Sequence, residues 1–546
     1  MMNISILNKK QSCDKLADDQ FISQWRLLST QSNSFSLIQE HGFVASWYEA
    51  YKNKYDPLLL LAYDEKEELV GILPLALHQQ EKSISHAGDE QAEYAGWVCK
   101  PAHQDEFLVL SLIALKKEFN LKKWQWGWLP PHSNTDWIKS NKLKENGIYI
   151  NLSAYESPIY NLKDSARVKK LRKSKSIRSN INRLKRTGDL RIERITDVSV
   201  AKKIFIDLKK KANFRNLAVY NNIPFEDDKN KEQWHLDHLE SGEGAHFTVL
   251  WQGDELLACN FGFCTEDTVM MGLVTYNPVQ GEYSPGSVFL IMLIEFLTEE
   301  GFHYLDLTPG GDPYKERFCN AHQTLYKAVI CFSQVCKFKD DLLTSVKNKI
   351  KQKYSYRDLV QIKSSVEKTV KNLLAYKPEQ IFNKTDALFK YTIPMDSAEE
   401  LEIRVQKYDD LLLYKNTKGY KQHKDIVFSA LRSFERGDTL YSLLQEGNLI
   451  AFVWCSTTGR KHWDSQINEL TSALGNETLL YGLYYLHGNN EKKVLINFLQ
   501  SVMILISSES VADNYLLKPT AIDASLILEA GLISTSLTEL GVAATA

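Results

Sequence analysis

The sequence predicts a mixed α/β fold, in which partly antiparallel sheets are flanked by helices. Two apolar runs, Leu58 to Tyr63 and Leu69 to Leu77, enclose a short charged turn, as in a β-hairpin. The runs Phe247 to Trp251 and Leu256 to Phe263 repeat this pattern later in the chain. Elsewhere, apolar residues recur at helical spacing. Strands and helices are therefore expected to alternate in more than one unit.

Length and composition agree with this class. The chain has 546 residues, which allows about three or four domains, and 44% of them are hydrophobic, which is enough for real cores. This composition excludes a disordered or fibrous protein. The formal net charge is only −2, so nucleic acid or a membrane would have to bind a local patch.

The segment Val279 to Ser287, VQGEYSPGS, is the most informative part of the chain. A strand-like run, Thr268 to Tyr276, precedes it, and apolar residues at helical spacing follow from Val288 to Thr298. Pro285 suits the first turn of that helix, where its missing N–H costs nothing. Such a turn leaves backbone N–H groups unpaired beside the positive end of the helix. The segment predicts a phosphate or pyrophosphate seat, and an ordinary strand-to-helix connection is the alternative.

A second strand and a short polar helix follow the segment. Gly301 is expected to end the first helix, and Phe302 to Leu307 has the pattern of a strand. The turn Thr308-Pro309-Gly310-Gly311-Asp312 then leads to Tyr314-Lys315. Strand, phosphate-type loop, helix, strand and small helix is the order of the second half of the GNAT acyltransferase fold.

The residues also match one branch of that fold. Ser284-Pro285-Gly286 before a helix, Gly301 followed by Asp306, Gly310 with Tyr314-Lys315, and a basic helix ending at Gly188 carry the resemblance. On these residues the chain resembles the CelD/BcsL-type acetyltransferase-like family, a relative of the FemAB/FemX transferases. The resemblance covers residues 20–335 and implies tandem GNAT-like acyltransferase units. The expected units are a GNAT-like half (20–157), a basic linker helix (165–186), a catalytic GNAT-like domain (189–337), a helical connector (338–396) and a degenerate GNAT-like domain (397–546).

The resemblance implies an acyltransferase that uses acetyl-CoA or another acyl-CoA and modifies an amine or hydroxyl of a small molecule or saccharide. Such chemistry needs a base for the acceptor and a proton donor for the leaving thiolate. Asp306 is the candidate base or orienting group, and Tyr314 is the candidate acid. The expected cofactor-binding residues are Ser284, Pro285, Gly286, Ser287 and Lys315. Glu282 opposes this assignment, because a carboxylate in the loop repels a pyrophosphate unless it points away.

The segment 165–186 is strongly basic. It contains ten Lys or Arg residues and no acid, while Val168, Leu171, Ile177, Ile181 and Leu184 recur at helical intervals. The cationic face has three candidate partners: the phosphates of CoA, a nucleic-acid backbone and an anionic membrane. A solvated linker helix is the alternative.

Three tryptophans, Trp124, Trp126 and Trp128, alternate at strand period, which predicts that they share one face. Core packing is expected, with a stacking platform for a sugar or base as the alternative.

No metal site and no disulfide framework are expected. His235 and His238 are three residues apart without an evident third ligand, and the eight cysteines form no CxxC motif. The N-terminus lacks a signal-peptide pattern, and the apolar run Val494 to Ser507 is short for a bilayer. We therefore expect a cytoplasmic protein without a transmembrane segment.

The C-terminal part repeats the earlier pattern more weakly. A helix is expected over His423 to Arg436. Strands are expected over Glu402 to Tyr414, Thr439 to Leu444, Asn448 to Thr457 and Leu479 to Leu486. The stretch His487 to Lys493 lacks the small residues of the earlier loop, so a structural or substrate-recognising role is expected for this unit.

Two further function classes stay open at this point. One is a FemX-like transferase that takes its aminoacyl group from charged tRNA, which would give the basic segment a direct role. The other is a non-catalytic scaffold. DNA is not an expected partner in either case.

Overall fold

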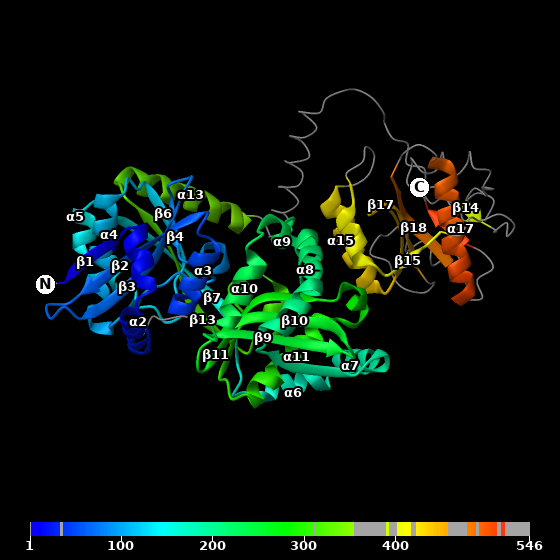
Figure 1. Ribbon diagram of the computed structural model, residues 1–546, viewed down its shortest axis with the longest axis horizontal. Coiled ribbons are helices and arrows are strands. Elements are labelled where there is room, and N and C mark those ends of the chain that lie inside the picture. Colours follow the sequence, from blue (N-terminus) through cyan, green and yellow to red (C-terminus); the bar gives the residue numbers. More distant parts are fainter. Residues whose placement is uncertain are drawn as a thin grey trace, which may run out of the picture.

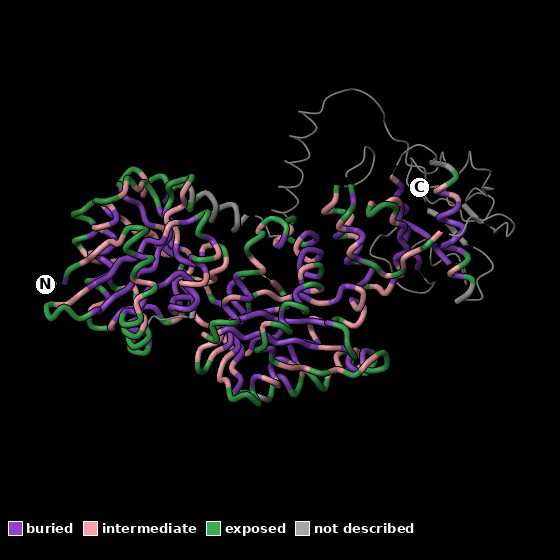
Figure 2. The backbone as a smooth tube through the Cα atoms, in the orientation of Figure 1, coloured by how far each residue is buried: buried purple, intermediate pink, exposed green. Residues whose placement is uncertain are grey.

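Three β-sheets follow one another along the long axis of the molecule, each covered by helices (Figure 1). The computed structural model describes residues 2–32, 37–310, 312–353, 389–391, 401–415, 422–456, 478–486, 491–509 and 515–518. Figure 2 shows that the central strands are buried and that exposed residues lie mainly on outer helices and turns. This arrangement confirms the predicted mixed α/β class.

The first sheet contains the predicted N-terminal hairpin. Its strands pair in the order β1-β2-β3-β4, with β5 also on β3. They span Asn3–Leu7 (β1), Tyr55–Tyr63 (β2), Leu69–His78 (β3), Ile84–His86 (β4) and Val98–Cys99 (β5). The helices around it are Lys9–Leu16 (α1), Asp19–Gln31 (α2), Leu37–Gln39 (η1), His41–Ala50 (α3), Asp89–Gln91 (η2), Pro101–His103 (η3) and Gln104–Glu118 (α4). Asp64 holds the hairpin turn, since its Oδ1 accepts from the amides of Lys66 and Glu68 at 2.9 Å.

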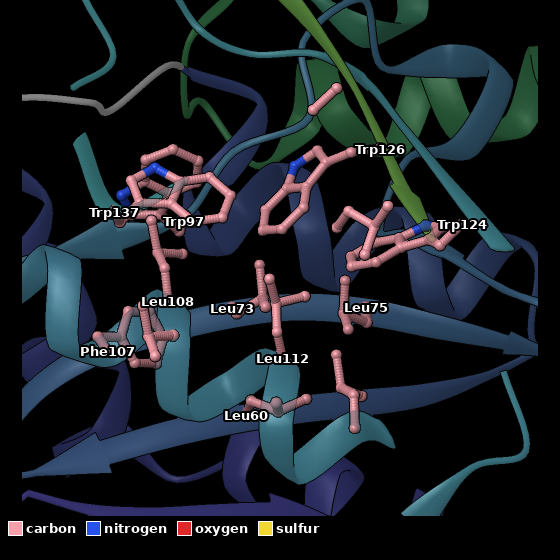
Figure 3. Close-up of a cluster of buried hydrophobic side chains, with 14 of the residues drawn as sticks. Leu60, Leu73, Leu75, Trp97, Phe107, Leu108, Leu112, Trp124, Trp126 and Trp137 are labelled. Carbon is pink, nitrogen blue, oxygen red and sulfur yellow. The ribbon is translucent and has the colours of Figure 1, made fainter. Parts of the chain in front are cut away.

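Both faces of this sheet are buried, which explains the continuous apolar runs. Leu58 and Leu60 of β2 pack with α4 and with Trp124 and Trp126, as Figure 3 shows for Leu60. Leu59 and Leu61 point the other way and pack with α2 and α3. The side-chain period of two along a strand distributes one run between two cores.

The second sheet has eight strands. It joins the two N-terminal regions that were expected from the sequence to form separate units. Its order is β6-β13-β7-β12-β11-β10-β9-β8. The strands are Lys123–Trp128 (β6), Tyr149–Asn161 (β7), Leu190–Ile195 (β8), Ala245–Gln252 (β9), Glu255–Cys264 (β10), Thr268–Tyr276 (β11), Tyr304–Asp306 (β12) and Ala321–Cys331 (β13). Strand β13 lies between β6 and β7, so residues 20–157 and 189–337 share one sheet.

The helices of this region are short apart from α8, α11 and α13. They are Asp136–Lys139 (η4), Asn141–Glu145 (α5), Ser165–Lys173 (α6), Lys175–Thr187 (α7), Val198–Tyr220 (α8), Pro224–Asp227 (α9), Lys231–Glu240 (α10), Pro278–Tyr283 (η5), Pro285–Glu299 (α11), Pro313–Phe318 (α12) and Gln334–Lys353 (α13). Asp197 caps α8, because its carboxylate accepts from the Ser199 amide at 2.6 Å. Pro285 begins α11, as predicted.

The basic segment forms two helices, α6 and α7, rather than the single helix expected over 165–186. The break is at Ser174, whose φ of −59° and ψ of 140° are not helical. Serine favours the position before a helix over the helix interior. The break turns the segment into a helical hairpin, in which the two helices pack on each other and on α11.

The three tryptophans of β6 do not share one face. Trp124 and Trp126 stack at 4.7 Å in the core beside Trp97 and Trp137 (Figure 3). Trp128 packs against the core on the other side of the first sheet. Gly127, with φ of 89°, and a register shift opposite Ala328 and Val329 interrupt the alternation. The core role is confirmed for Trp124 and Trp126.

The third sheet has the strand order β14-β19-β18-β17-β16-β15. Its strands are Phe389–Tyr391 (β14), Arg404–Val405 (β15), Thr439–Gln445 (β16), Asn448–Ser456 (β17), Thr478–Tyr485 (β18) and Tyr515–Lys518 (β19), and its helices are Tyr408–Leu413 (η6), His423–Arg436 (α15) and Glu491–Glu509 (α17). The expected strand over Glu402 to Tyr414 is wrong, because only Arg404–Val405 forms a strand and Tyr408–Leu413 forms the turn-like helix η6. The expected helical connector includes strand β14, and residues 354–388 and 487–490 lie outside the described part.

The third unit packs on the second through α15. Phe214 of α8 lies in the same core as Tyr408 and Phe434. Lys210 forms an ion pair with Asp409 at 2.8 Å. This contact brings the end of α15 to η5, which forms the first part of the predicted phosphate segment.

Candidate active site

Strands β11 and β12 are parallel and pair over only three residues. Thr268, Val269 and Met270 lie opposite Tyr304, Leu305 and Asp306. After Met270, β11 continues to Tyr276 while β12 ends. The strands therefore part at Asp306, which leaves backbone groups of β11 without a partner on that side.

A cleft of about 810 Å³ opens where the strands part. Its floor includes Gly272 and Thr308. Its walls come from both N-terminal units and include Trp47, Tyr51, Tyr55, Asp228, Lys231 and Trp234. Tyr51 donates to Asp228 at 2.6 Å, and Lys231 donates to Gln91 at 2.7 Å, so the two walls are hydrogen-bonded together. The cleft combines aromatic rings with charged groups.

Asp306 is fully enclosed at the end of β12. Its carboxylate accepts from Tyr94 Oη at 2.6 Å, from the Thr308 amide at 2.8 Å and from Gln323 Nε2 at 3.2 Å. Burial raises the pKa of Asp306, and these donors oppose the rise. Asp306 lines a second cavity of about 500 Å³ with Tyr94 and Gln323. In this environment Asp306 orients the end of β12.

Lys315 supports the turn that follows Asp306. Its Nζ donates to Thr308 O at 3.1 Å, Thr308 Oγ1 at 3.0 Å and Pro309 O at 3.2 Å. Thr308 has φ of 64°, a strained conformation for a β-branched residue. Burial lowers the pKa of Lys315. Because three acceptors occupy its three hydrogens, the ammonium serves this turn instead of offering hydrogens to a phosphate.

Glu93 is the acidic side chain that the sequence reading missed. It lines the cleft together with Thr308 and is half-buried. Burial raises the pKa of Glu93, Asp306 adds to the rise, and Lys315 opposes it. A carboxylate with a raised pKa that faces a cleft is suited to accept a proton. Its neighbour Tyr94 fixes its place by bonding to Asp306.

Tyr314 lies on α12 and packs against the core under α11. Burial raises the pKa of Tyr314 to about 12, and Arg215 opposes the rise. The phenol is therefore protonated at neutral pH and able to donate. Burial also raises the pKa of Tyr276, the last residue of β11, and the charge of Arg215 on α8 opposes that rise.

The predicted phosphate segment has fewer free amides than expected. The amides of Ser287 and Val288 bond to Ser284 O at 2.9 and 3.1 Å. Pro285 has none, which leaves the Gly286 amide, the second of α11, without an intrahelical acceptor. The difference arises because η5 and the Ser284 turn use their own backbone groups.

Side chains add positive charge around this segment. Arg317 donates to Ser287 Oγ at 2.9 Å. Gly286 lies under the Tyr276 ring. A Cβ on Gly286 would be 3.3 Å from Cδ1 of that ring. Glu282 forms an ion pair with Arg183 of α7 at 3.7 Å, so its charge is partly neutralised. The structure thus brings Ser284, Ser287 and Arg317 together at the start of α11.

The histidines of α10 are core residues. Burial lowers the pKa of His235 to about 3 and that of His238 to about 4, so both are neutral. The described residues contain one group with metal-ligand spacing, Glu316, Cys319 and His322, with ligand atoms within 4.8 Å of one another. His322 pairs with Glu316 at 2.9 Å, and three ligands leave a structural zinc site incomplete.

All eight cysteines are free, and five of them are buried. Within the described ranges, every helix is too short or too polar to cross a membrane.

Residues 170–316 match the family model described as an acetyltransferase (GNAT) domain. Among solved structures, the chain is similar to FemX, with 11% identity over 57% of this chain and 95% of that chain and a TM-score of 0.40. It is also similar to a tandem GNAT protein from the clavulanic acid biosynthesis pathway, with 10% identity over 60% and 98% and a TM-score of 0.36. For L-PGS from Bacillus licheniformis, the identity is 10% over 57% and 91%, with a TM-score of 0.36.

No protein with curated annotation matches the chain. The family match does not distinguish the CelD/BcsL branch from other GNAT proteins. It spans every site residue predicted from the sequence, from Ser284 to Lys315. Residues 170–316 of this chain are therefore similar to a GNAT acetyltransferase domain.

Proposed function

We propose that the protein is an acyl-CoA-dependent N- or O-acyltransferase whose acceptor binds in the cleft between the first two units. The observation that carries the proposal is the parting of β11 and β12, with a cleft of about 810 Å³ opening at the same point and β11 running on to Tyr276, which lies against Gly286 at the start of α11. Unpaired strand backbone next to a helix N-terminus suits an extended ligand with a phosphate end.

The donor is assigned to the start of α11. Ser284, Pro285, Gly286 and Ser287 form the turn, and the Gly286 amide and Arg317 offer hydrogens to a phosphate. Acyl-CoA, when bound, supplies an activated thioester carbonyl. Lys315 acts from behind by holding the Thr308 turn.

Proton transfer is assigned to two residues, and a third residue positions one of them. Glu93 takes the proton from the acceptor amine or hydroxyl as it attacks the carbonyl carbon. Tyr314 gives its proton to the sulfur as the carbon–sulfur bond breaks. Asp306 positions Tyr94 and the Thr308 turn, and so keeps Glu93 in the cleft.

A small saccharide or amino sugar is the proposed acceptor class. Trp47 and Tyr51 stack at 5.3 Å in the cleft wall. Tyr51 is bonded to Asp228, and Tyr55 is bonded to Asp89 at 2.5 Å. Aromatic faces next to carboxylates match a ligand with an apolar ring face and polar edges.

Calorimetric titration with acetyl-CoA tests the proposal. We expect saturable one-to-one binding that weakens at least about tenfold in Gly286→Glu, because the new side chain meets Tyr276 and places a negative charge at the helix start. Gln24→Glu, an exposed change of equal charge on α2, is the control and should leave the affinity unchanged. Absence of binding to the wild-type protein would overturn the donor assignment, and binding of charged tRNA in its place would favour aminoacyl transfer.

A further inference from the structure

A third cavity lies between α6 and α7, and the proposed reaction does not use it. Its volume is about 380 Å³. The lining residues are Lys169, Arg172, Lys173, Arg178, Ile181, Asn182 and Lys185. Five of these seven side chains carry a positive charge, and segment 165–186 has no acid to oppose them.

The cations form two stripes that share this one cavity. On α6 they are Lys169, Arg172 and Lys173, at spacing i, i+3 and i+4. On α7 the cations are Arg178 and Lys185, seven residues apart, and Ile181 and Asn182 lie on the same face between them. Residues so spaced lie on one helix face, so each helix presents its basic stripe to the same space. Neighbouring helices ordinarily meet through apolar or oppositely charged groups, because like charges repel.

The charges in the cavity are only partly balanced by the protein. Arg172 forms an ion pair with Glu295 of α11. Within the described ranges, no carboxylate lies within 4.0 Å of the nitrogens of Lys169, Lys173, Arg178 or Lys185. An anion that enters the cavity would therefore remove the repulsion between the helices.

The apolar residues of the hairpin identify the kind of ligand. Val168, Ile181 and Leu184 are buried against α11 and the second sheet. Among the described residues, the exposed large hydrophobic side chains include none from 165–187. The large apolar side chains of the hairpin are thus at least partly buried, which does not favour insertion into lipid, and the hairpin has no aromatic ring on which a base could stack.

We propose that the facing stripes of α6 and α7 bind a multiply charged phosphate group, which bridges the two helices. The cavity volume of about 380 Å³ has room for a di- or triphosphate or for a phosphorylated headgroup. The ligand class is thus a compact phosphate-bearing anion. This inference is independent of the proposed acyl transfer, because it rests on different residues.

The first test is calorimetric titration of the full chain with inorganic tripolyphosphate. We expect one site, with affinity that falls between about 50 and about 200 mM salt. The double variant Lys173→Glu/Arg178→Glu should weaken binding at least about tenfold, because it reverses one charge on each stripe. Lys170→Glu/Lys175→Glu changes the same total charge on the same helices outside the cavity and should change the affinity less than about twofold.

Three results of this test would overturn the proposal. The first is no saturable binding of the wild-type chain to tripolyphosphate or to the vesicles described next. The second is equal weakening in both double variants, and the third is binding of many anions per chain. A parallel arm uses phosphatidylcholine vesicles with and without a phosphomonoester lipid. Sedimentation with the phosphomonoester vesicles that is lost only in the Lys173/Arg178 variant would identify a headgroup as the source. Tighter binding of duplex RNA that both variants weaken equally would assign the hairpin to a nucleic-acid backbone and refute the cavity.

A stability measurement separates this proposal from a folding defect. Lys173→Gln/Arg178→Gln removes two of the facing charges without adding new ones. At low salt we expect it to raise the Tm of the anion-free protein, while tripolyphosphate should raise the Tm of the wild type and leave that of the variant unchanged. A lower Tm for this variant would show that the stripes do not repel, and would contradict the proposal.

Discussion

The second and third units use the same order of elements for different ends. In the second unit, β8, α8, β9, β10, β11, α11 and β12 build the sheet order β12-β11-β10-β9-β8. In the third unit, β15, α15, β16, β17, β18, α17 and β19 build β19-β18-β17-β16-β15. The last two strands are parallel in both units. Figure 1 shows the two sheets on either side of the contact between α8 and α15.

The units differ in where their buried polar groups lie. In the second unit they stand at and after the end of β12, where Asp306 borders a cavity and Lys315 holds the turn that follows. In the third unit they stand between α15 and β16, where Tyr481 donates to Asp438 at 2.5 Å and accepts from Arg436 at 2.6 Å. On the proposed assignment, a shared element order thus provides the reaction site in one unit and a structural support in the other.

Glu93→Gln should produce the largest effect, since it removes the proposed base from the cleft of the second unit. We expect kcat to fall by about 10² to 10⁴ while the affinity for acyl-CoA stays unchanged. Glu90→Gln is the control, because Glu90 is an exposed acid of the same cleft. Wild-type activity should rise with pH through a midpoint above the ordinary value of 4.5, because burial raises the pKa of Glu93. Equal losses in both variants would remove Glu93 from the mechanism.

Asp438→Ala should have the opposite signature. It leaves the buried Arg436 guanidinium without its carboxylate, which costs about 3 to 5 kcal/mol of unfolding free energy. Protein that remains folded should keep the kcat of the wild type. Arg432→Ala, which breaks an exposed pair with Glu435 on the same helix, should cost less than about 1 kcal/mol. Denaturant unfolding with parallel kinetics decides the matter, and a large loss of kcat in folded Asp438→Ala would end the division between reaction site and support.

Elements with a strong local pattern could be predicted from the sequence. Strand Thr268–Tyr276 and helix His423–Arg436 have the predicted bounds, because turn residues flank the strand and Gly437 ends the helix. The run near Leu411 to Leu413 was misread as a strand, since a short apolar run does not distinguish a strand from one turn of helix. Ser174 breaks the basic helix. Because no glycine or proline stands there, the sequence carries no strong signal of the break.

The site was only partly predictable, because its parts come from distant segments. Asp306 and Lys315 lie close in sequence, and the sequence predicts Asp306 at the end of a strand and Lys315 at the start of the short helix that follows. Glu93 reaches the cleft through the bond from Tyr94 to Asp306, which spans more than two hundred residues and leaves no periodic pattern. The insertion of β13 between β6 and β7 is likewise a pairing between distant segments.

Gly281→Val tests the contact between the two units. A Cβ at this position would lie 3.0 Å from the Glu435 amide nitrogen, which is backbone and cannot turn away. We expect a loss of about 1 to 3 kcal/mol and faster hydrogen exchange in both η5 and α15. Gly447→Ala meets nothing within 4 Å and should leave exchange in α15 unchanged. Exchange that is faster in η5 alone would show that α15 does not depend on this contact.

Glu40→Gln should produce the smallest effect and extends the comparison to the junction of the first two units. Burial raises the pKa of Glu40 to about 7, and the nearby Glu243, which accepts from the Gly42 amide, adds to the rise. Because the folded state holds this proton more tightly than the unfolded chain, stability is complete below pH 4.5 and declines as the pH rises through 7. At pH 8 the variant should be more stable than the wild type by about 1 kcal/mol after allowance for solvent screening, and at pH 4 the two should be alike. Thermal unfolding at both pH values measures this, and a benefit of equal size at pH 4 would show that packing rather than ionisation is responsible. The contact between α8 and α15 has an apolar centre, so its contribution to stability should lack this pH dependence. The junction of the second and third units should differ in this from the junction of the first two.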